Sequence, residues 1–338
     1  LFDEMSYTKN APNNLVIIFG KINNKISKPK VIYSLLDKKI KKIFSGYESN
    51  FLIDEKNIIY SFGNNDNGQL GIKYDLNNIF IDENNPKEIK INELENNEYI
   101  KDIYCAEKFS FFLSNKNRIY ITNKISEPKK LNYFFEKEKI IKISIGDNFC
   151  LFLTGWGNVY NIDYNENNSE IINDKINKVP NLNNIQKIFC GYKHCFAIAK
   201  NNIIFCWGNN YRGQLGLNDN SEHVLIPKKL VLNYDEEADI DNIFCGKDFS
   251  IFHNTKKEIF VCGNNEEGQL GIKKEAYLYK YKNEDCLIPV LNEQFYNLQI
   301  IKLCCGEVFC LAMIKDSITK IINIWTWGSD TARHLQPF

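Results

Sequence analysis

The sequence predicts an all-β fold that is built from one short unit repeated along the chain. Two observations lead to this prediction. Short segments rich in Ile, Phe, Tyr and Val alternate with Gly, Asn and Pro, which is typical of strands separated by tight turns. Two half-motifs then recur at intervals of some tens of residues, and no helical periodicity of useful length lies between them.

The first half-motif is a β-like stretch that reaches a small residue, in most copies Gly, and continues into an apolar run. We name that small residue the anchor, and it occurs six times. The anchors are Gly46, Ala106, Gly146, Gly191, Gly246 and Gly306. Their spacing varies because the insertions fall in polar, Asn-rich loops, where additional chain costs little free energy.

The second half-motif is a short strand that ends in an aromatic residue and Gly. Its copies, including degenerate ones, number seven: Phe19-Gly20, Phe62-Gly63, the strands at 118–122 and 157–162, Trp207-Gly208, Cys262-Gly263 and Trp327-Gly328. Residues 14–20 therefore contain the second half-motif without a first half-motif before it. A closed ring shows this arrangement when the N-terminal strand completes the last blade, so we expect ring closure of that kind.

Three copies carry a longer turn, Gly-Asn-Asn-x-x-Gly-Gln-Leu-Gly, which we name the clasp. Its glycine spacing is that of a phosphate-binding loop, but such a loop needs Lys and then Ser or Thr where the clasp has Gln-Leu. We interpret the clasp as a structural turn in which Gly permits a tight or left-handed backbone and Asn caps the turn. The predicted structural turn residues are Gly63, Gly68, Gln69, Gly71, Gly208, Gly213, Gln214, Gly216, Gly263, Gly268, Gln269 and Gly271.

Two stretches, Cys-Gly-Tyr-Lys-His-Cys-Phe-Ala-Ile (190–198) and Cys-Trp-Gly-Asn-Asn-Tyr-Arg-Gly-Gln-Leu-Gly-Leu (206–217), resemble the repeat of the regulator of chromosome condensation family. The resemblance extends over essentially the whole chain. It implies a seven-bladed β-propeller with four-stranded blades that forms a single domain over residues 1–338. The expected repeat units are 14–38 (a half unit), 40–98, 100–138, 140–183, 185–238, 240–298 and 300–338.

Composition excludes several partners. The formal net charge is zero, so no basic field favours direct nucleic-acid binding. No apolar run is long enough to span a bilayer, and we expect no membrane association. The chain begins at Leu1 and not at Met, which leaves open that it is a fragment. We expect a monomeric propeller.

Most of the eleven cysteines lie at equivalent repeat positions, one blade apart. We therefore interpret them as small buried hydrophobic residues with reduced thiols, and we expect an intracellular protein in the reducing cytoplasm or nucleus. Cys190, His194 and Cys195 could form part of a metal site, but no second matched pair accompanies them. Strand alternation would also turn the two cysteines to opposite faces. No metal, no cofactor and no catalytic residue is predicted.

In a propeller, the turns that follow the anchors gather around one mouth of the central channel. These turns supply the candidate partner-binding residues Glu48, Glu107, Asp147, His194, Asp248 and Glu307. Family members that act as guanine-nucleotide exchange factors for a Ran-type GTPase use such a face, and the resemblance carries over Asp147 and Asp248, with His194 less firmly. The chain departs from the family pattern because the usual His three residues after the anchor occurs only at His194.

Two hypotheses for the function follow. The leading one is a non-catalytic protein–protein interaction platform, because a propeller presents loops from many blades on a rigid scaffold. The alternative is nucleotide exchange on a Ran-like small GTPase, with chromatin association. Light sensing, known for a propeller branch with many tryptophans, is disfavoured because only four tryptophans are present.

Overall fold

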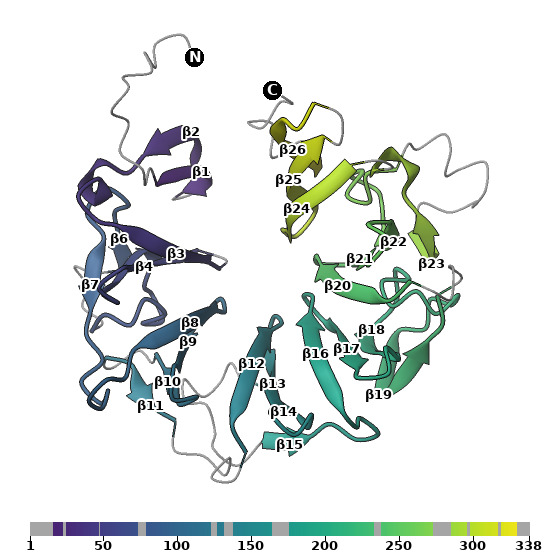
Figure 1. Ribbon diagram of the computed structural model, residues 1–338, viewed down its shortest axis with the longest axis horizontal. Helices are drawn as coiled ribbons and strands as arrows, with labels where there is room; N and C mark the ends of the chain where they lie inside the picture. Colours follow the sequence, from purple (N-terminus) through teal and green to yellow (C-terminus); the bar gives the residue numbers. More distant parts are fainter. Residues whose placement is uncertain are drawn as a thin grey trace. The chain divides into compact units, whose positions relative to one another are not determined.

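The computed structural model describes residues 16–22, 25–46, 48–73, 79–122, 127–131, 138–163, 176–232, 238–272, 285–295, 298–316 and 319–329. The chain divides into two compact units, residues 1–132 and 133–338, and each unit consists of antiparallel sheets that follow one another along the sequence (Figure 1). None of the described helices has the length and apolar character that a membrane span requires.

The first unit contains three sheets among its described residues. Strands β1 and β2 form a two-stranded sheet, β8 to β11 form a four-stranded sheet, and β3, β4 and β5 continue into both β6 and β7, which pair with different parts of β5. The elements are β1 (Ile17–Ile22), β2 (Lys25–Val31), η1 (Tyr33–Leu35), β3 (Ile40–Ser45), β4 (Ser49–Asp54), β5 (Ile59–Asn64), β6 (Phe80–Ile81), β7 (Lys87–Ile89), β8 (Ile100–Cys105), β9 (Ser110–Ser114), β10 (Ile119–Ile121) and β11 (Lys129–Lys130).

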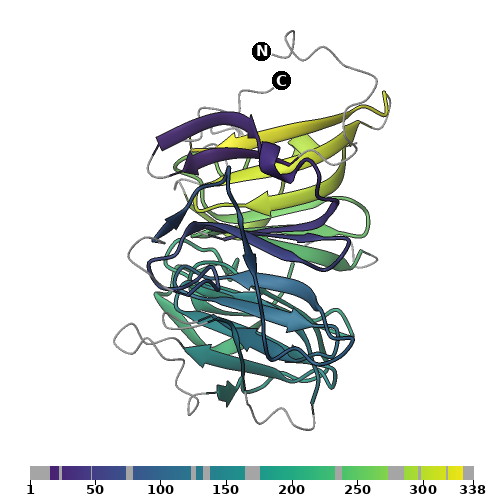
Figure 2. The same cartoon turned by 90° about the vertical axis from the view of Figure 1, so that its left-hand side faces the viewer.

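The second unit contains four sheets among its described residues, and in each sheet neighbouring strands are also neighbours in sequence. The yellow strands of the last of these sheets are visible in Figure 2. Three sheets have four strands, and the last, β24 to β26, has three. The elements are β12 (Ile140–Ile145), β13 (Phe149–Thr154), β14 (Val159–Asp163), β15 (Ile176–Lys178), β16 (Ile185–Cys190), β17 (His194–Ala199), β18 (Ile204–Asn209), β19 (His223–Leu230), β20 (Ile240–Cys245), β21 (Phe249–Asn254), β22 (Ile259–Asn264), β23 (Asp285–Leu291), η5 (Glu293–Phe295), β24 (Leu298–Cys305), β25 (Phe309–Asp316) and β26 (Ile322–Gly328).

The predicted all-β class is correct, but the predicted seven blades are wrong. Among the described residues six sheets have three or more strands, and β1 with β2 forms only a hairpin. Among the described strands β1 pairs with β2 in that separate sheet, and not with the last sheet as ring closure by the N-terminal strand requires. The physical reason is that each of the six anchors lies in the turn between the first two strands of a sheet. The degenerate Phe19-Gly20, which makes the seventh copy of the second half-motif, has no anchor before it.

The core of each unit lies between successive sheets, where the second strands supply their largest side chains. Phe51 of β4 packs edge-on against Phe112 of β9, with ring centroids 5.5 Å apart. Phe196 of β17 meets Phe252 of β21 in the same way at 5.3 Å. All four rings are fully buried, so each unit has at least one aromatic pair between two neighbouring sheets.

The anchor is glycine in most repeats because the side chain three residues later fills the space that a Cβ would need. A Cβ built on Gly146, Gly246 or Gly306 would lie between 1.9 and 2.3 Å from the ring of the Phe three residues on. At Gly191 the ring is that of His194, with Cε1 at 2.2 Å from such a Cβ. The His194 ring is therefore a packing element of β17.

His194 is fully buried, and its Nε2 lies 2.9 Å from the hydroxyl oxygen of Ser250. That hydroxyl donates a hydrogen bond to the carbonyl oxygen of Gln214, at 2.8 Å. Burial lowers the pKa of His194 to about 3, because the protonated ring would lose its hydration. The imidazole is therefore neutral in the folded protein near neutral pH.

Each of the three clasps joins its own sheet to the next one. In the clasp of 208–216, the side-chain oxygen of Asn210 accepts a hydrogen bond from the Leu215 backbone, and Gln214 accepts one from the Arg212 backbone. Leu215 is fully buried. Gly216 has a φ of +71°, and a Cβ there would lie 2.7 Å from the ring of Pro289 on β23. The turn therefore holds its own backbone and packs against the following sheet.

We expect Gly213→Ala to destabilise the protein more than Gly268→Ala. Both residues occupy the same clasp position, with φ of +75° and +77°, so each alanine incurs backbone strain of about 1–2 kcal/mol. A Cβ at Gly213 would lie 2.7 Å from Leu287 Cδ2, whereas no described atom lies within 4 Å of a Cβ at Gly268. Thermal or urea unfolding of the two variants measures the difference, and equal losses would contradict the packing explanation.

We expect His194 to make stability depend on pH between its two pKa values. Because its pKa is about 3 in the folded protein and 6.5 in the unfolded chain, protonation below pH 6.5 favours unfolding. The unfolding free energy should fall by up to about 1.4 kcal/mol per pH unit on this account. His194→Phe, which matches the sister repeats, should flatten the curve in that window, whereas the exposed control His223→Gln should not. Parallel curves for wild type and His194→Phe would refute this role.

Candidate functional site

The candidate residues Asp147, Asp248 and Glu307 lie in turns of the second unit that are joined by backbone hydrogen bonds. We name the turns 146–148, 191–193, 246–248 and 306–308 the anchor turns. The Asp147 amide donates to the Tyr192 carbonyl at 2.8 Å, and the Tyr192 amide donates to the Gly246 carbonyl at 3.2 Å. The Lys247 amide donates to the Glu307 carbonyl at 3.0 Å. Four successive sheets therefore present one connected row of turns.

Backbone hydrogen bonds from the third strands hold the turns of the row in place. The Lys193 carbonyl accepts a hydrogen bond from the Asn209 amide, and the Asp248 carbonyl accepts one from the Asn264 amide, both at 2.8 Å. The residue before each of these amides has to be glycine, because a Cβ on Gly208 would lie 2.5 Å from the Lys193 carbonyl oxygen. This contact explains why the second half-motif ends in Gly.

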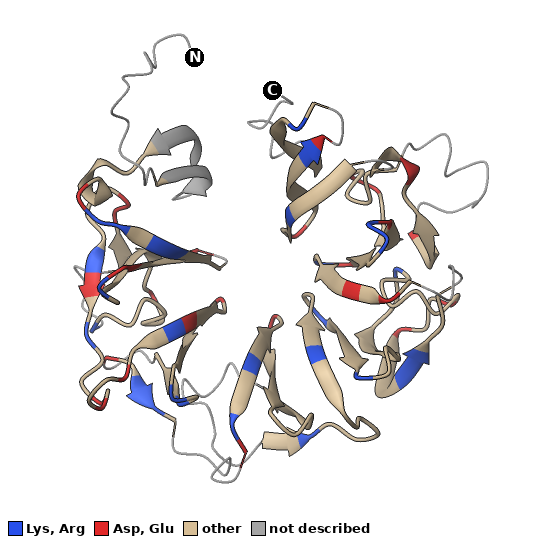
Figure 3. Cartoon of the chain, in the orientation of Figure 1, with Lys and Arg blue, Asp and Glu red and all other residues tan. Residues whose placement is uncertain are grey.

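Lysines alternate with the acidic side chains along the row. Lys193 Nζ lies 3.8 Å from Asp147 Oδ2, and Lys247 Nζ lies 3.6 Å from Glu307 Oε1. Both ammonium groups also lie 5.3 Å from the centre of the Tyr192 ring. The row therefore carries charges of both signs, as the red and blue segments along the first strands and their turns indicate (Figure 3). The pair of Lys247 and Glu307 is exposed on both sides, so it contributes little to stability and is available to a partner. In the other pair Lys193 is exposed, whereas the Asp147 side chain is largely buried.

Asp248 is the most constrained of the carboxylates in the row. Its Oδ1 accepts a hydrogen bond from Gln214 Nε2 at 3.2 Å, and its Oδ2 accepts one from the Tyr211 hydroxyl at 3.3 Å. Burial raises the pKa of Asp248, and the hydrogen bond from Tyr211 opposes that rise. The clasp of one sheet thus orients the carboxylate of the next sheet.

The other candidate residues do not join the row. His194 follows the second anchor turn, but its ring is in the core. Glu48 and Glu107 belong to the first unit, where both side chains are exposed, and Glu48 accepts a hydrogen bond from Asn64 at 2.7 Å. The structure brings together three of the six candidates.

Sequence reasoning missed Tyr211 and Arg212, which lie at the two variable positions of the clasp. Tyr211 is exposed, and Arg212 pairs with Glu266 at 2.9 Å and with Asp285 at 3.2 Å. The signal was available in the sequence, because these two positions alone differ in every copy of an otherwise constant Gly-Asn-Asn-x-x-Gly-Gln-Leu-Gly turn.

A groove of about 280 Å³ opens beside the row, between the sheet of β12 to β15 and that of β16 to β19. Trp207, Pro180 and Leu225 provide its apolar walls, and Lys178 and Lys193 are the charged residues that line it. Leu225 is 81% exposed, so its side chain is accessible to a partner. The groove can accept an apolar side chain of a partner that also carries negative charge.

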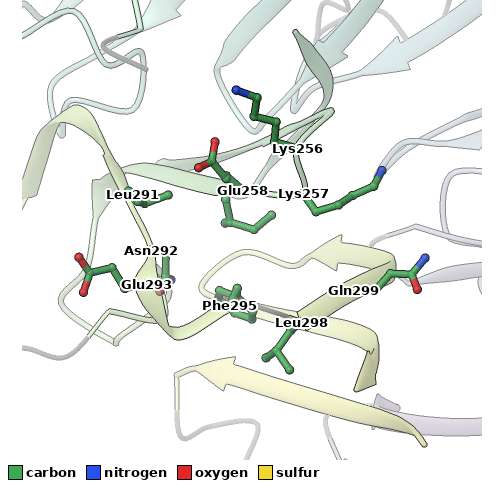
Figure 4. A pocket seen from close by; sticks show the side chains of 10 residues that line it. Lys256, Lys257, Glu258, Leu291, Asn292, Glu293, Phe295, Leu298 and Gln299 are labelled. Atoms are coloured by element: carbon green, nitrogen blue, oxygen red, sulfur yellow. The ribbon is translucent and has the colours of Figure 1, made fainter. Parts of the chain in front are cut away.

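A larger cavity of about 440 Å³ lies at the other end of β21, between its turn to β22 and the start of β24 (Figure 4). Lys256, Lys257 and Gln299 contribute polar groups to it, and Phe295 and Leu298 contribute apolar ones. Asp248 precedes β21, whereas Lys256 follows it, so this cavity is separate from the anchor turns.

Among the described residues, no group of three His, Cys, Asp or Glu side chains is arranged to hold a metal ion. One argument against a zinc site was nevertheless wrong. Cys190 and Cys195 are direct cross-strand partners in β16 and β17, so their side chains lie on the same side of the sheet.

Comparison with known proteins gives sequence relatives that match part of the chain. The chain is 26% identical over 249 residues to the guanine nucleotide exchange factor SRM1 of Saccharomyces cerevisiae, which covers 69% of this chain and 49% of that protein. It is 23% identical over 260 residues to the mouse RCC1-like G exchanging factor-like protein, covering 69% and 55%. Human HERC4, a probable E3 ubiquitin-protein ligase, is 29% identical over 155 residues, which are 45% of this chain and 13% of that protein.

These three relatives are longer proteins, and the chain spans between 13% and 55% of their length. Solved structures show the same fold. Yeast RCC1 (Prp20) bound to Kap60 has a TM-score of 0.79 at 21% identity, over 95% of this chain and 78% of that one. A second structure, of Prp20p from Saccharomyces cerevisiae, has a TM-score of 0.76 at 22% identity, over 94% and 78%. Residues 19–336 match the family described as the RCC1-like domain, and the chain belongs to that family.

Proposed function

We propose that this chain binds a Ran-like small GTPase through its anchor turns and accelerates release of the bound guanine nucleotide. Two sequence relatives are named as exchange factors or as similar to them, and the structural neighbour Prp20p was characterised for its binding to Gsp1p and histones. The observation that carries the proposal is the row of hydrogen-bonded turns from four successive sheets, three of which contain Asp147, Asp248 and Glu307.

Nucleotide exchange requires no covalent chemistry from this chain. The protein must bind the nucleotide-free GTPase more tightly than the nucleotide-bound form, because a ligand shifts an equilibrium only by its differential affinity for the two states. A surface suited to this task is rigid, so that it does not adapt equally well to both forms. The backbone hydrogen bonds between turns and from the third strands supply that rigidity.

The charges of the row suit a partner surface of mixed sign. Asp248 and Glu307 can accept hydrogen bonds from Lys or Arg of the GTPase, while Lys193 and Lys247 can exchange their intramolecular acidic partners for those of the GTPase. Trp207 and Leu225 in the adjacent groove offer an apolar contact of the kind that contributes most to affinity. A monomeric chain in the cytoplasm or nucleus, without direct contact to nucleic acid, remains our prediction.

We expect the purified chain to accelerate release of fluorescent GDP from a Ran-like GTPase. Asp147→Asn combined with Asp248→Asn keeps the side-chain volumes and removes two charges, so the acceleration should fall at least tenfold, or about 1.4 kcal/mol. Asp239→Asn is the matched control, because Asp239 is exposed and precedes β20, at the opposite end of that strand from Asp248. No acceleration by the wild-type chain would refute the exchange proposal.

A second candidate is a protein-interaction platform without exchange activity. It is favoured by relatives in which the matching region is a small part of a longer enzyme, as in HERC4 and in the kinase Nek8 of Danio rerio, where it covers 22%. Calorimetric titration of the chain with the nucleotide-free GTPase separates the two functions. Binding without accelerated release would support the platform, and absence of binding would exclude the GTPase as the partner.

A further inference from the structure

Cys305 and Cys310 face each other across the hairpin that carries the last anchor turn. They are direct cross-strand partners in β24 and β25, and their sulfur atoms lie 3.6 Å apart. Cys310 is fully buried, Cys305 is half-buried, and the neighbouring Cys304 is exposed. Cysteines at equivalent repeat positions were predicted to lie one blade apart, and this pair within one sheet was not predicted.

The backbone pattern places the two cysteines at a position where side chains come close. The Gly306 amide donates to the Phe309 carbonyl at 2.8 Å, so Gly306 and Phe309 form a hydrogen-bonded pair. The next pair along an antiparallel ladder, Cys305 with Cys310, is then a non-hydrogen-bonded pair, in which the Cα atoms lie about 4.5 Å apart. That separation falls within the range that disulfides span, so the bond requires little movement of the backbone.

The equivalent cross-strand positions of the other sheets rarely offer two thiols. They pair Ser45 with Asn50, Cys105 with Ser110, Ile145 with Cys150, Cys190 with Cys195, and Cys245 with Ser250. One other sheet therefore has two cysteines in this register, and the Cys190–Cys195 pair serves as an internal comparison. Cys190 is half-buried and Cys195 is 3% exposed, which is close to the environment of the first pair.

We propose that Cys305 and Cys310 form a reversible disulfide by exchange with a low-molecular-weight disulfide such as oxidised glutathione. The Cys305 thiolate attacks one glutathione sulfur, which forms a mixed disulfide and expels one glutathione thiolate. The Cys310 thiolate then attacks the Cys305 sulfur and expels the second glutathione thiolate. Two protein thiols are oxidised, one glutathione disulfide is reduced, and the two protons from the cysteines pass to the expelled thiolates.

The disulfide would close a short loop around Gly306, Glu307, Val308 and Phe309. That loop contains the anchor turn whose Glu307 carbonyl and carboxylate both contact Lys247. Oxidation would therefore restrict the last turn of the row, at the end where β24 to β26 lack a fourth described strand. The proposal does not depend on a GTPase partner, because it concerns the chemistry of two side chains in the isolated chain.

Burial raises the pKa of the Cys305 thiol, since a thiolate in that position loses hydration. The thiolate is the attacking species, so the reaction should be slow near neutral pH. Its rate should rise about tenfold for each pH unit until the pH approaches the pKa of the thiol. A rate independent of pH would contradict exchange initiated by this thiol.

The test incubates the folded, reduced chain with oxidised glutathione, alkylates the remaining thiols and measures the intact mass. We expect two fewer of the eleven thiols to be alkylated, and full recovery after dithiothreitol. Cys305→Ser combined with Cys310→Ser should keep all its remaining thiols. Cys190→Ser with Cys195→Ser, and Cys304→Ser alone, should each lose two thiols as wild type does.

Peptide mapping of the wild-type chain makes the assignment independent of how well the variants fold. Cleavage after Phe309 separates Cys305 from Cys310, so the expected product is a pair of peptides joined through these two residues. Retention of all eleven thiols, a stable glutathione adduct, or a bond between Cys190 and Cys195 instead would overturn the proposal.

Discussion

The constraint on which the rest of the structure depends is a close contact between the first and third strands of a sheet: the carbonyl that precedes the second strand lies against the glycine that ends the third strand. Where the glycine half-motif is intact, the amide after the glycine donates to that carbonyl at 2.8 Å, as Asn64 does to Glu48 and Ser329 does to Val308. A side chain on the glycine would collide with the same oxygen, at 2.1 Å for Gly63 and 2.3 Å for Gly328. One hydrogen bond and one missing Cβ thus fix the first hairpin against the third strand.

The candidate site follows from this constraint by two further steps. Rings such as that of Phe249 cover the anchor glycine and occupy the core, which leaves the turn itself at the surface. The clasp of the preceding sheet then reaches the turn, where Gln214 and Tyr211 hold the Asp248 carboxylate. The polar groups of the site are therefore positioned by residues whose first role is to join neighbouring sheets.

The sequence was sufficient for the parts of the fold that repeat. The strand positions follow from alternating apolar and turn residues, and the clasp shows the left-handed glycines and the buried Leu215 that its residue types require. The predicted number of blades was wrong because every aromatic-Gly pair was counted as one blade. Each of the six sheets begins with two strands joined by a turn that contains an anchor, and no anchor precedes β1. The contact between Cys305 and Cys310 was missed because the register of two paired strands depends on which amide of the turn donates a hydrogen bond. The spacing of the two cysteines in the sequence does not specify that register. His194 was expected at the surface, but its ring fills the space above Gly191.

The two variable positions of each clasp have a consequence for engineering. The two hydrogen bonds described within the clasp of 208–216 join main-chain amides to the side chains of Asn210 and Gln214, so the backbone of the turn does not depend on the side chains of Tyr211 and Arg212. Those two side chains instead contact Asp248, Glu266 and Asp285 of the next sheet. Their counterparts in the sister copies are Asp66 with Asn67 and Glu266 with Glu267. A library randomised at these six codons could be selected for new ligands, as antibody loops are, while the surrounding scaffold tolerates the diversity.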